Sequence, residues 1–366
     1  MKSFIDLQRT VGSQPAHIGV LLNRIDVGKG REQLHADQVP ELLRSLAERT
    51  KVESVRASNA IEGVEVSPDR AAKIIERPDI RVRNRNEKEF AGYRDAIEYV
   101  MRLDEPGLPD VPLALHFHRQ LFRHADGRGG YLKRDENEIA GRDEHGRRYA
   151  IFRTVPSAET PFFVTELFER YRTAVAAQAA HPLLLLSALI LDFLAIHPVL
   201  DGNGRVARLL TAYELIRLDY GVARYVSIEQ RIYESRNSYY EALRQSQERW
   251  HDAEHRIWPW AEYLLNVLSD GYDSFEARVA GATSAAGKTK QDRARDQILN
   301  AGPNRFRFRD LKRALPGISE HTLRLVLRQL KSEGLVRSEG RGAGAEWVRT
   351  GAAEESGAPP TSAPAR

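Results

Sequence analysis

The chain of 366 residues contains no cysteine, which excludes disulfide bonds, thiolate nucleophiles and cysteine metal ligands. It also lacks a membrane-spanning segment, because the apolar run from Leu183 to Ala195 is too short and contains Asp192. No apolar signal-peptide region follows Met1. We therefore expect a soluble cytoplasmic protein that makes no contact with membranes.

A strong net charge is absent as well, since the formal charge is only +4 at pH 7. The charges are unevenly distributed, however. Residues 288–350 contain 15 Lys or Arg against 7 Asp or Glu, a net of +8, while residues 1–287 carry a net of −3. The sequence therefore predicts a basic C-terminal domain, joined to the rest of the chain by a flexible linker of small residues within 276–290.

The most informative stretch that is present spans residues 197–208, with the sequence HPVLDGNGRVAR. The apolar run before it predicts a buried helix that ends at His197, because Pro198 cannot continue a helix. The residues after Gly204 favour a second helix. The motif therefore lies in a turn between two helices, and residues 202–204 lie at the N-terminus of the second one.

That placement predicts an anion-binding site. The glycines on either side of Asn203 allow a positive φ and a close approach of the backbone amides, and the helix N-terminus adds partial positive charge. Arg205 and Arg208 are three residues apart and can bind different phosphates of one polyphosphate. Asp201 can hold Mg²⁺, which binds through one or two carboxylates and substrate phosphates. His197 is the natural general base for an attacking hydroxyl.

The ordered combination resembles the signature of the Fic family, His-x-Phe-x-(Asp or Glu)-Gly-Asn-Gly-Arg-x-x-Arg, and departs from it only at Val199, which replaces phenylalanine. The resemblance implies transfer of AMP from ATP to a Ser, Thr or Tyr hydroxyl of a protein. The family's roles then fall on the general base His197, the Mg²⁺ ligand Asp201, the α-phosphate cradle Gly202, Asn203 and Gly204, and the outer-phosphate ligands Arg205 and Arg208.

A second match lies upstream in residues 58–63 (SNAIEG), at the end of a helix predicted over residues 40–63. This segment resembles the inhibitory motif of the family, (Ser or Thr)-x-x-x-Glu-(Gly or Asn). Ser58 and Glu62 are four residues apart, so they share one face of the helix. The resemblance implies that Glu62 pairs with Arg208 and occupies the position of the γ-phosphate of ATP. The alternative is a solvated carboxylate at a helix end.

Two short runs predict a β-hairpin, the first ending in Glu138, Ile139, Ala140 and Gly141 and the second covering residues 149–152. The hairpin resembles the flap of the Fic fold, in which a strand registers the backbone of the target beside the active site. The resemblance places the first strand beside the nucleotide and the acceptor side chain. An ordinary surface hairpin is the alternative.

A further helical stretch contains Tyr239 and resembles the family's helix that closes the adenosine pocket. The resemblance gives Tyr239 a contact with the nucleotide. Tyrosines on amphipathic helices also belong to hydrophobic cores, so the pattern leaves both roles open. The Fic resemblance as a whole covers residues 35–275.

The basic C-terminal domain shows helical stretches at 291–300, 308–315 and 319–333, followed by two short strands. This order resembles a winged helix-turn-helix. His321, Arg324 and Arg328 are expected on the exposed side of the third helix, where such a module reaches bases and phosphates. Winged helices also dock proteins or form dimers, so DNA binding through residues 291–350 is one of two interpretations.

These patterns together predict a mainly α protein, with a Fic-type helical core, a small β-hairpin flap and a C-terminal winged helix-turn-helix. The predicted domains are an N-terminal helical region at 1–112, a catalytic core at 113–275, the linker at 276–290, the winged helix at 291–350 and a disordered tail at 351–366.

The predicted function is that of an autoinhibited, Mg²⁺-dependent protein adenylyltransferase that uses ATP and whose site can also remove AMP. Its target protein is not specified by any motif. A homodimer is a further expectation, because family members of this organisation are often dimers. The alternative is a DNA-binding transcriptional regulator whose Fic domain acts mainly as an ATP sensor.

Overall fold

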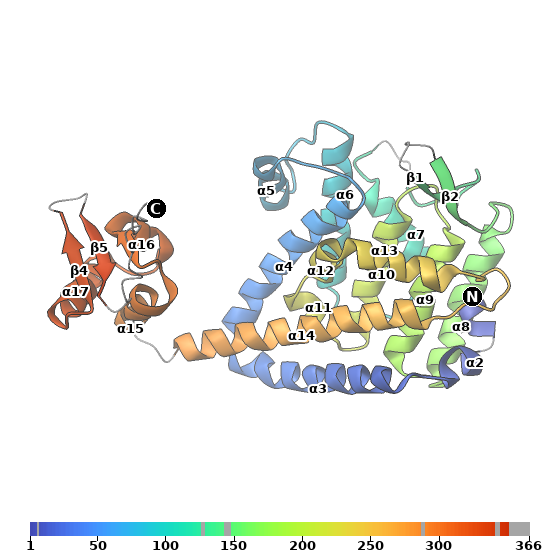
Figure 1. The fold of residues 1–366 in the computed structure, drawn as a ribbon. Coiled ribbons are helices and arrows are strands. Elements are labelled where there is room, and N and C mark those ends of the chain that lie inside the picture. Colours follow the sequence, from blue (N-terminus) through green and yellow to red (C-terminus); the bar gives the residue numbers. More distant parts are fainter. Residues whose placement is uncertain (6, 126–128, 143–147, 287–289, 341–344, 351–366) are drawn as a thin grey trace, which may run out of the picture. The chain divides into compact units, whose positions relative to one another are not determined.

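The computed structural model describes residues 1–366 except 6, 126–128, 143–147, 287–289, 341–344 and 351–366 (Figure 1). The chain divides into two compact units, Met1–Val279 and Ala280–Arg366. Within the described residues, no helix is both long enough and apolar enough to cross a bilayer. The predicted tail at 351–366 lies outside the described residues.

The first unit is almost entirely helical, as predicted (Figure 1). Its first helices are α1 (Lys2–Ile5), α2 (Leu7–Gly12), α3 (Ala16–Gln38), α4 (Pro40–Ile61), α5 (Pro68–Glu76), α6 (Arg85–Met101) and α7 (Val111–Leu121). A hairpin of β1 (Glu138–Arg142) and β2 (Arg148–Arg153) follows. The later helices are α8 (Thr160–Ala176), α9 (Pro182–Ile196), α10 (Asn203–Arg217), α11 (Val222–Tyr225), α12 (Ile228–Glu234), α13 (Arg236–Gln247) and α14 (Trp258–Ala286).

Helices α9 and α10 form the centre of this unit. Every residue of α9 after Pro182 is buried, and so is α10 from Asn203 to Ile216 apart from Gly204. Helix α9 packs against α1, α8 and α13, and α10 packs against α4, α6 and α7. Residues 1–112 and 113–275 therefore share one compact unit, because the N-terminal helices cover the helix that follows the motif.

Asp192, the one acid in apolar α9, is satisfied by hydrogen bonds. It is fully buried, and its carboxylate accepts from the backbone N–H of Ser3 at 3.0 Å and from the Ser3 hydroxyl at 2.7 Å. The indole N–H of Trp250 donates to it at 2.7 Å. These bonds offset the cost of burying a carboxylate, so α9 continues through this position.

The prediction of a flexible linker at 276–290 is wrong for most of these residues. Helix α14 continues to Ala286, and Phe275 and Val279 are buried against the first unit. Alanine is the best helix former, so a stretch of small residues that looks like a flexible connection can extend a helix whose apolar stripe is already packed. Residues 287–289 lie outside the described part of the chain.

The second unit contains α15 (Lys290–Asp296), a π-helical turn η1 (Gln297–Ala301), β3 (Arg305–Arg307), α16 (Phe308–Ala314), α17 (Glu320–Ser332), β4 (Val336–Glu339) and β5 (Glu346–Arg349). The strands form an antiparallel sheet in the order β3-β5-β4. The predicted helices and the two-stranded wing are present. Strand β3 was not predicted, because three residues are too few to show an alternating pattern.

A separate apolar core supports the second unit. It includes Ile298, Leu323, Leu327 and Leu330, and Trp347 packs against it. Ser319 caps the start of α17, since its hydroxyl accepts from the backbone N–H of Thr322 at 3.2 Å. The unit therefore has the winged helix-turn-helix arrangement that the sequence predicted.

Candidate active site

The turn between α9 and α10 presents His197 at the end of a helix. His197 adopts a left-handed conformation with φ of 56°, and Pro198 follows it. Such a conformation is strained in a residue that is not glycine, so surrounding contacts have to maintain it. Gly202, with φ of 90°, begins the next helix without that strain. One short loop thus joins the histidine to the N-terminus of α10.

The imidazole of His197 is prepared to accept a proton. Its Nδ1 lies 3.1 Å from the carbonyl oxygen of Leu194, so Nδ1 carries the hydrogen and Nε2 keeps a lone pair. Burial lowers the pKa of His197 to about 4; the Leu194 carbonyl opposes this effect, and the charge of Lys133 adds to it. At neutral pH the ring is uncharged, which is the form that a general base needs.

Arg208 on α10 is held by the end of α4, as the resemblance implied. Its Nε donates to the hydroxyl of Ser58 at 2.8 Å, and its Nη2 donates to the Ser58 carbonyl at 3.1 Å and to Oε1 of Glu62 at 2.8 Å. Burial alone lowers the pKa of Arg208, but the charge and hydrogen bond of Glu62, together with Tyr239 and Tyr93, outweigh it and the pKa is raised. The buried guanidinium therefore stays charged and needs an anion beside it.

The carboxylate of Glu62 lies over the first turn of α10. A Cβ atom on Gly204 would come within 2.3 Å of Oε1 of Glu62 and 3.2 Å of Nη1 of Arg208. Nη1 of Arg208 is buried and has no hydrogen-bond partner among the described residues. A helix N-terminus and an unused guanidinium donor both favour an anion. Glu62 thus fills the space in which a phosphate can meet both groups.

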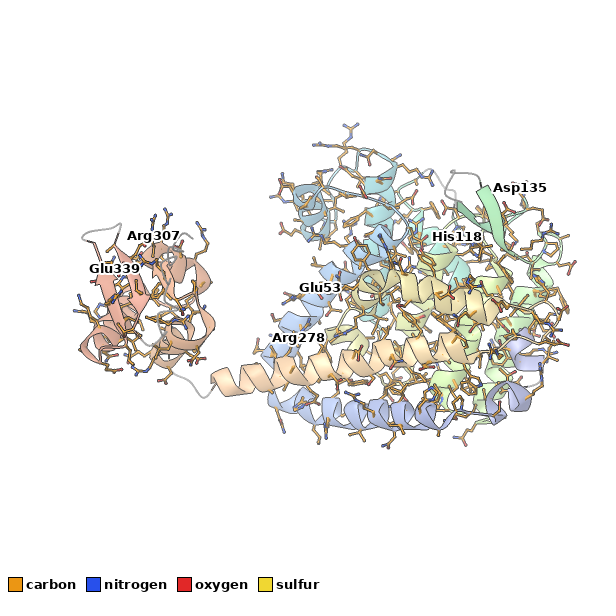
Figure 2. The ribbon with its side chains drawn as sticks, in the orientation of Figure 1. Glu53, His118, Asp135, Arg278, Arg307 and Glu339 are labelled. Carbon is orange, nitrogen blue, oxygen red and sulfur yellow. The ribbon has the colours of Figure 1, made fainter. Side chains whose placement is uncertain are left out.

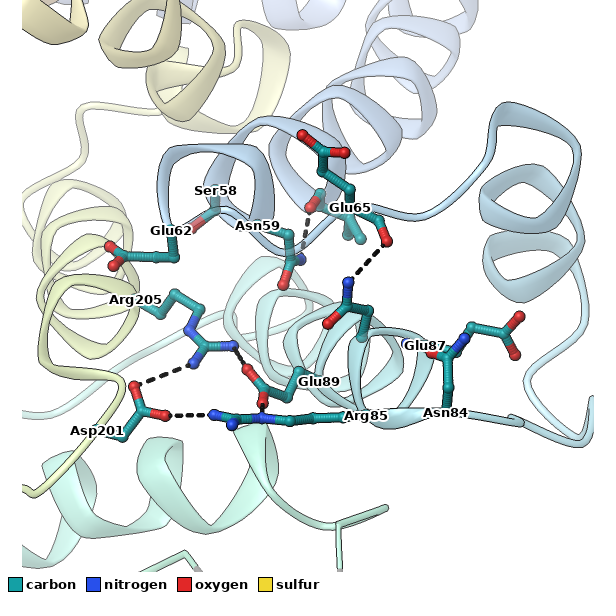
Figure 3. Close-up of polar contacts among 12 residues, drawn as sticks. Ser58, Asn59, Glu62, Glu65, Asn84, Arg85, Glu87, Glu89, Asp201 and Arg205 are labelled. Carbon is teal, nitrogen blue, oxygen red and sulfur yellow. Dashed lines mark hydrogen bonds and ion pairs between the residues drawn. The ribbon is translucent and has the colours of Figure 1, made fainter. Parts of the chain in front are cut away.

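Asp201 belongs to a closed ring of four alternating charges (Figure 3). Its Oδ2 lies 3.0 Å from Arg85, whose Nε donates at 2.6 Å to Oε1 of Glu89. The ring closes through Arg205, which lies 2.7 Å from Oε2 of Glu89 and 3.7 Å from Oδ1 of Asp201. Arg205 and Glu89 are buried, whereas Arg85 and Asp201 are 70% and 54% exposed. Two arginines therefore orient Asp201, and solvent still reaches it.

Two predicted phosphate ligands have internal partners. Arg205 is committed to Glu89 and Asp201. The side chain of Asn203 accepts from the backbone N–H of Val199 at 3.0 Å and donates to the Val199 carbonyl at 2.6 Å. Both side chains are therefore held by protein partners, while Nε of Arg205 is buried and has no hydrogen-bond partner among the described residues. Phosphate binding by either side chain stays a prediction. Buried polar groups take the partners that the fold supplies, and these were not visible in the motif.

Tyr239 lies in the core and not in an open pocket wall. It is 3% exposed, and its ring packs edge-on against Tyr240, Trp260 and Tyr263. The core packing that the pattern left open is therefore present. Burial raises the pKa of Tyr239, on which the charges of Arg208 and Glu62 also act, so the nucleotide contact stays a prediction. Its exposed neighbour Tyr240 contacts the end of α4, with its hydroxyl 3.4 Å from the Ile61 carbonyl.

The predicted hairpin of β1 and β2, called the flap below, is present and antiparallel. Its register pairs Glu138 with Arg153, Ile139 with Phe152, Ala140 with Ala150, and Gly141 with Tyr149, with an irregularity between the second and third pairs. The segment before β1 contacts the loop between α9 and α10, residues 197–202, which is called the catalytic loop below. The backbone N–H of Lys133 donates to the Pro198 carbonyl of this loop at 2.9 Å. The hairpin therefore begins beside His197.

A cavity of about 900 Å³ opens beside Asp201. Residues of α6, α7, the segment before the flap and the catalytic loop line it, and among them are His118 and Asp135 (Figure 2). His118 is buried, and its Nδ1 accepts from the backbone N–H of Gly130 at 3.0 Å. Burial lowers the pKa of His118 to about 4. The cavity connects the Asp201 carboxylate to solvent.

The donor set suits Mg²⁺ that arrives with a polyphosphate. Asp201 is an accessible carboxylate, and Mg²⁺ is commonly held by one or two carboxylates plus substrate phosphates. Across the part of the chain that the structure describes, no group of three or more His, Asp or Glu side chains could hold a metal ion. The described residues therefore fit a cation carried by a nucleotide better than a metal centre made by the protein alone.

Sequence reasoning missed several residues around the site. Arg85 and Glu89 orient Asp201 and Arg205, and Lys133 and Asn137 contact the catalytic loop. The only local signal was the spacing of Arg85 and Glu89, which favours a pair on one helix face. Their other partners lie more than a hundred residues away, so no motif contained them.

Known proteins share these two units. Residues 109–215 match the model of the Fic/DOC family, and residues 297–344 match that of the HxlR-like helix-turn-helix. A search of the curated proteins gives no match.

Among solved structures, a Fic family protein from Desulfovibrio desulfuricans has a TM-score of 0.59 and 21% identity, over 94% of this chain and 98% of that chain. A Fic domain containing signaling protein from Bacteroides thetaiotaomicron has a TM-score of 0.57 and 20% identity, over 73% and 98%. Fic-1 from C. elegans has a TM-score of 0.54 and 19% identity, over 74% of each chain. The chain therefore carries a Fic/DOC family domain, followed by an HxlR-like helix-turn-helix.

Proposed function

We propose that the protein is an autoinhibited, Mg²⁺-dependent protein adenylyltransferase. The observation that carries this proposal is the ion pair of Glu62 and Arg208 above Gly204. An acid in that place competes with a phosphate for the helix N-terminus and for the guanidinium. The Fic/DOC domain makes transfer of AMP the reaction class that the site supports best.

The reaction requires Glu62 to leave, after which Arg208 binds the outer phosphates of ATP. Nε2 of His197 takes the proton of the acceptor hydroxyl, and the hydroxyl oxygen attacks the α-phosphorus. The bond between the α-phosphorus and its bridging oxygen breaks, pyrophosphate leaves, and AMP remains on the acceptor. Asp201, together with the phosphates, would hold Mg²⁺, which would supply positive charge near the leaving pyrophosphate. Positioning and electrostatics provide most of the catalysis.

The remaining site residues support that step in the proposed scheme. Arg205 orients Asp201, and the bare backbone at Gly204 admits the phosphate that replaces Glu62. The flap strand from Glu138 to Gly141 pairs with an extended segment of the target by strand addition.

The test uses three full-length proteins: wild type, Glu62→Gly, and Glu62→Gly combined with His197→Ala. Each is incubated with Mg²⁺ and ATP labelled at the α-phosphate, alone and with a cell extract. We expect Glu62→Gly to label itself or another protein, the wild type to label little, and the double variant to label nothing. ATP labelled at the γ-phosphate must leave no label. The proposal fails if α-label is not transferred by any of the three.

We propose that the same site can also remove AMP by hydrolysis. A water positioned with the help of Glu62 attacks the α-phosphorus, the bond between phosphorus and the acceptor oxygen breaks, and His197 returns a proton to the acceptor hydroxyl as AMP is released. Wild-type protein mixed with a target that Glu62→Gly has already labelled measures this directly. Release of AMP that depends on His197 supports removal, whereas retention of the label excludes it.

We infer a second function, DNA binding, for the second unit. The HxlR-like match favours it, and so does a basic face on α17. His321, Arg324 and Arg328 are exposed and line a cavity of about 610 Å³ together with Phe308 and Trp347. Salt-dependent retardation of duplex DNA by the full chain tests it. If DNA binds while Glu62→Gly never turns over ATP, the Fic domain is an ATP sensor in a regulator.

A further inference from the structure

Lys133 occupies an uncommon environment for a lysine. It is 4% exposed, and its Nζ donates to Oδ1 of Asn137 at 2.7 Å, to the Thr154 hydroxyl at 3.0 Å and to the Ile196 carbonyl at 3.3 Å. Within the described residues, no carboxylate forms an ion pair with it. Burial lowers its pKa to about 8, and Glu136 opposes that effect. A buried ammonium supported only by neutral oxygens is costly, so this arrangement requires an explanation.

Residues 133–137, which precede the flap, contact the chain on both sides of His197. Nζ of Lys133 reaches the carbonyl of Ile196 just before the histidine, and its backbone N–H reaches the carbonyl of Pro198 just after it. The side chain of Asn137 donates to the next carbonyl, that of Val199, at 2.9 Å. The segment before the flap therefore holds the catalytic loop on both sides of the base.

Two physical reasons make these contacts effective. The last carbonyls of α9 have no partner within the helix, and a cation is favoured at a helix C-terminus. The left-handed conformation of His197 is strained and persists only where neighbouring contacts maintain it. Lys133 places a cation at the C-terminus of α9 and also contacts the residues on either side of His197, although it lies far from them in the sequence.

We propose that Lys133 and Asn137 are positioning residues, which hold the loop around His197 in its strained conformation and couple the flap to the catalytic base. The part of this inference that concerns turnover rests on the proposed function. The target strand on the flap and the base then keep one geometry, because both are anchored to the segment from 133 to 137.

The charge of Lys133 also acts on the imidazole. The charged groups that face His197 are Lys133 from the segment before the flap, Glu62 from the end of α4, and Asp201 from the catalytic loop. Lys133 disfavours the imidazolium, whereas the two carboxylates favour it. Removal of the lysine charge therefore raises the pKa of His197.

The first measurement needs no catalysis. Histidine titration by NMR is recorded on full-length wild type, Lys133→Met and the control Arg134→Met, and the His197 signal is assigned with His197→Gln. Arg134 is exposed and next in sequence, and within the described residues its side chain makes no hydrogen bond or ion pair with the loop, so its removal deletes a charge but no polar contact to the loop. We expect Lys133→Met to raise the pKa of His197 by about one unit and to mix the two ring tautomers. Arg134→Met leaves both unchanged.

The second measurement is turnover in the Glu62→Gly background. Lys133→Met lowers kcat about 100-fold, because a displaced base impairs chemistry. KM for ATP changes by no more than about threefold, since the phosphate site is intact. Arg134→Met keeps kcat within about twofold. Melting temperatures are recorded for every variant, so that a loss of stability is separated from a loss of positioning.

The outcomes separate the two proposals. A lower melting temperature with unchanged kcat and unchanged His197 titration shows that Lys133 only stabilises the fold and overturns the inference. A changed titration, with no turnover in any Glu62→Gly protein, supports the positioning role and rejects the proposed function. If Lys133→Met does not fold, Asn137→Ala is used; it must shift the tautomers and lower kcat by a smaller factor, and unchanged values overturn the inference.

Discussion

The carboxylate of Glu62 and the guanidinium of Arg208 lie 2.8 Å apart, although 146 residues separate them in the chain. Their exposures differ, since Glu62 is 31% exposed and Arg208 is 4% exposed. The more exposed Glu62 can move into solvent, whereas the buried Arg208 remains in place and then requires another anion. Withdrawal of the end of α4 therefore converts an internal ion pair into a site for a phosphate.

Glu62→Gln is expected to lower the melting temperature, because it leaves a buried guanidinium without its counter-charge. The free energy of unfolding falls by about 1–2 kcal/mol, given the partial exposure of Glu62. Mg²⁺ and ATP are expected to raise the melting temperature of this variant more than that of the wild type, since the nucleotide restores an anion. Thermal unfolding with and without nucleotide measures both effects. The control Glu53→Gln, from an i,i+4 pair with Arg49 on α4, gains no extra stabilisation from ATP. Equal shifts in all three proteins contradict the prediction.

Arg85→Ala is expected to lower the Mg²⁺ concentration that ATP binding requires. The substitution frees Oδ2 of Asp201 from an exposed ion pair, whose loss is worth up to about 1 kcal/mol, or about fivefold in affinity. ATP binding to Glu62→Gly protein, with and without Arg85→Ala, is measured at increasing Mg²⁺ concentration. The half-saturating Mg²⁺ concentration is expected to fall by up to about fivefold when Arg85 is replaced. Arg83→Ala removes a cation from the same cavity without a contact to Asp201, so it serves as the control. A higher Mg²⁺ requirement for Arg85→Ala than for Arg83→Ala contradicts this account.

Acid is expected to destabilise the first unit through His118 and His197. Burial lowers the pKa of each to about 4, whereas an unfolded histidine titrates near 6.5. Between these values the unfolded state binds more protons, so stability is complete above pH ~6.5 and falls as the pH approaches ~4. Each histidine accounts for a loss of about 3 kcal/mol at most.

Urea unfolding at neutral and acidic pH measures this loss. His197→Gln is expected to reduce it by up to about 3 kcal/mol, whereas His17→Gln, at an exposed position on α3, leaves it unchanged. An identical pH dependence in His197→Gln and the wild type refutes the prediction.

Arg328→Ala is expected to weaken DNA binding by the second unit. The side chain is exposed on α17 and lines the cavity beside Trp347. Loss of one phosphate contact reduces the slope of log affinity against log salt by about one. Fluorescence anisotropy of labelled duplex DNA at several salt concentrations measures the slope. Arg295→Ala is the control, because Arg295 is already paired with Glu333. Equal slopes for both variants argue against a phosphate contact at Arg328.

Much of the site is encoded locally. Pro198 stops α9, Gly202 takes a positive φ, and the helix-forming residues after it begin α10, so the loop that carries His197 follows from neighbouring residues alone. The same holds for the end of α4, which brings Ser58 and Glu62 onto one face. The hairpin and the winged helix are also readable from short patterns, because turns, caps and periodicity depend on interactions within a few residues.

Long-range packing sets the rest. Arg205 and Asn203 look like ligands in the motif, and the fold also pairs them with Glu89 and Val199, which the motif did not predict. Tyr239 is buried because Trp260 and Tyr263 cover it. The hydrogen bond from Lys133 to the Ile196 carbonyl joins residues that lie more than sixty positions apart in the chain. Whether a polar side chain faces a ligand or a neighbour depends on which partners the fold brings within hydrogen-bonding distance, and a motif of twelve residues contains no information about partners that lie outside it.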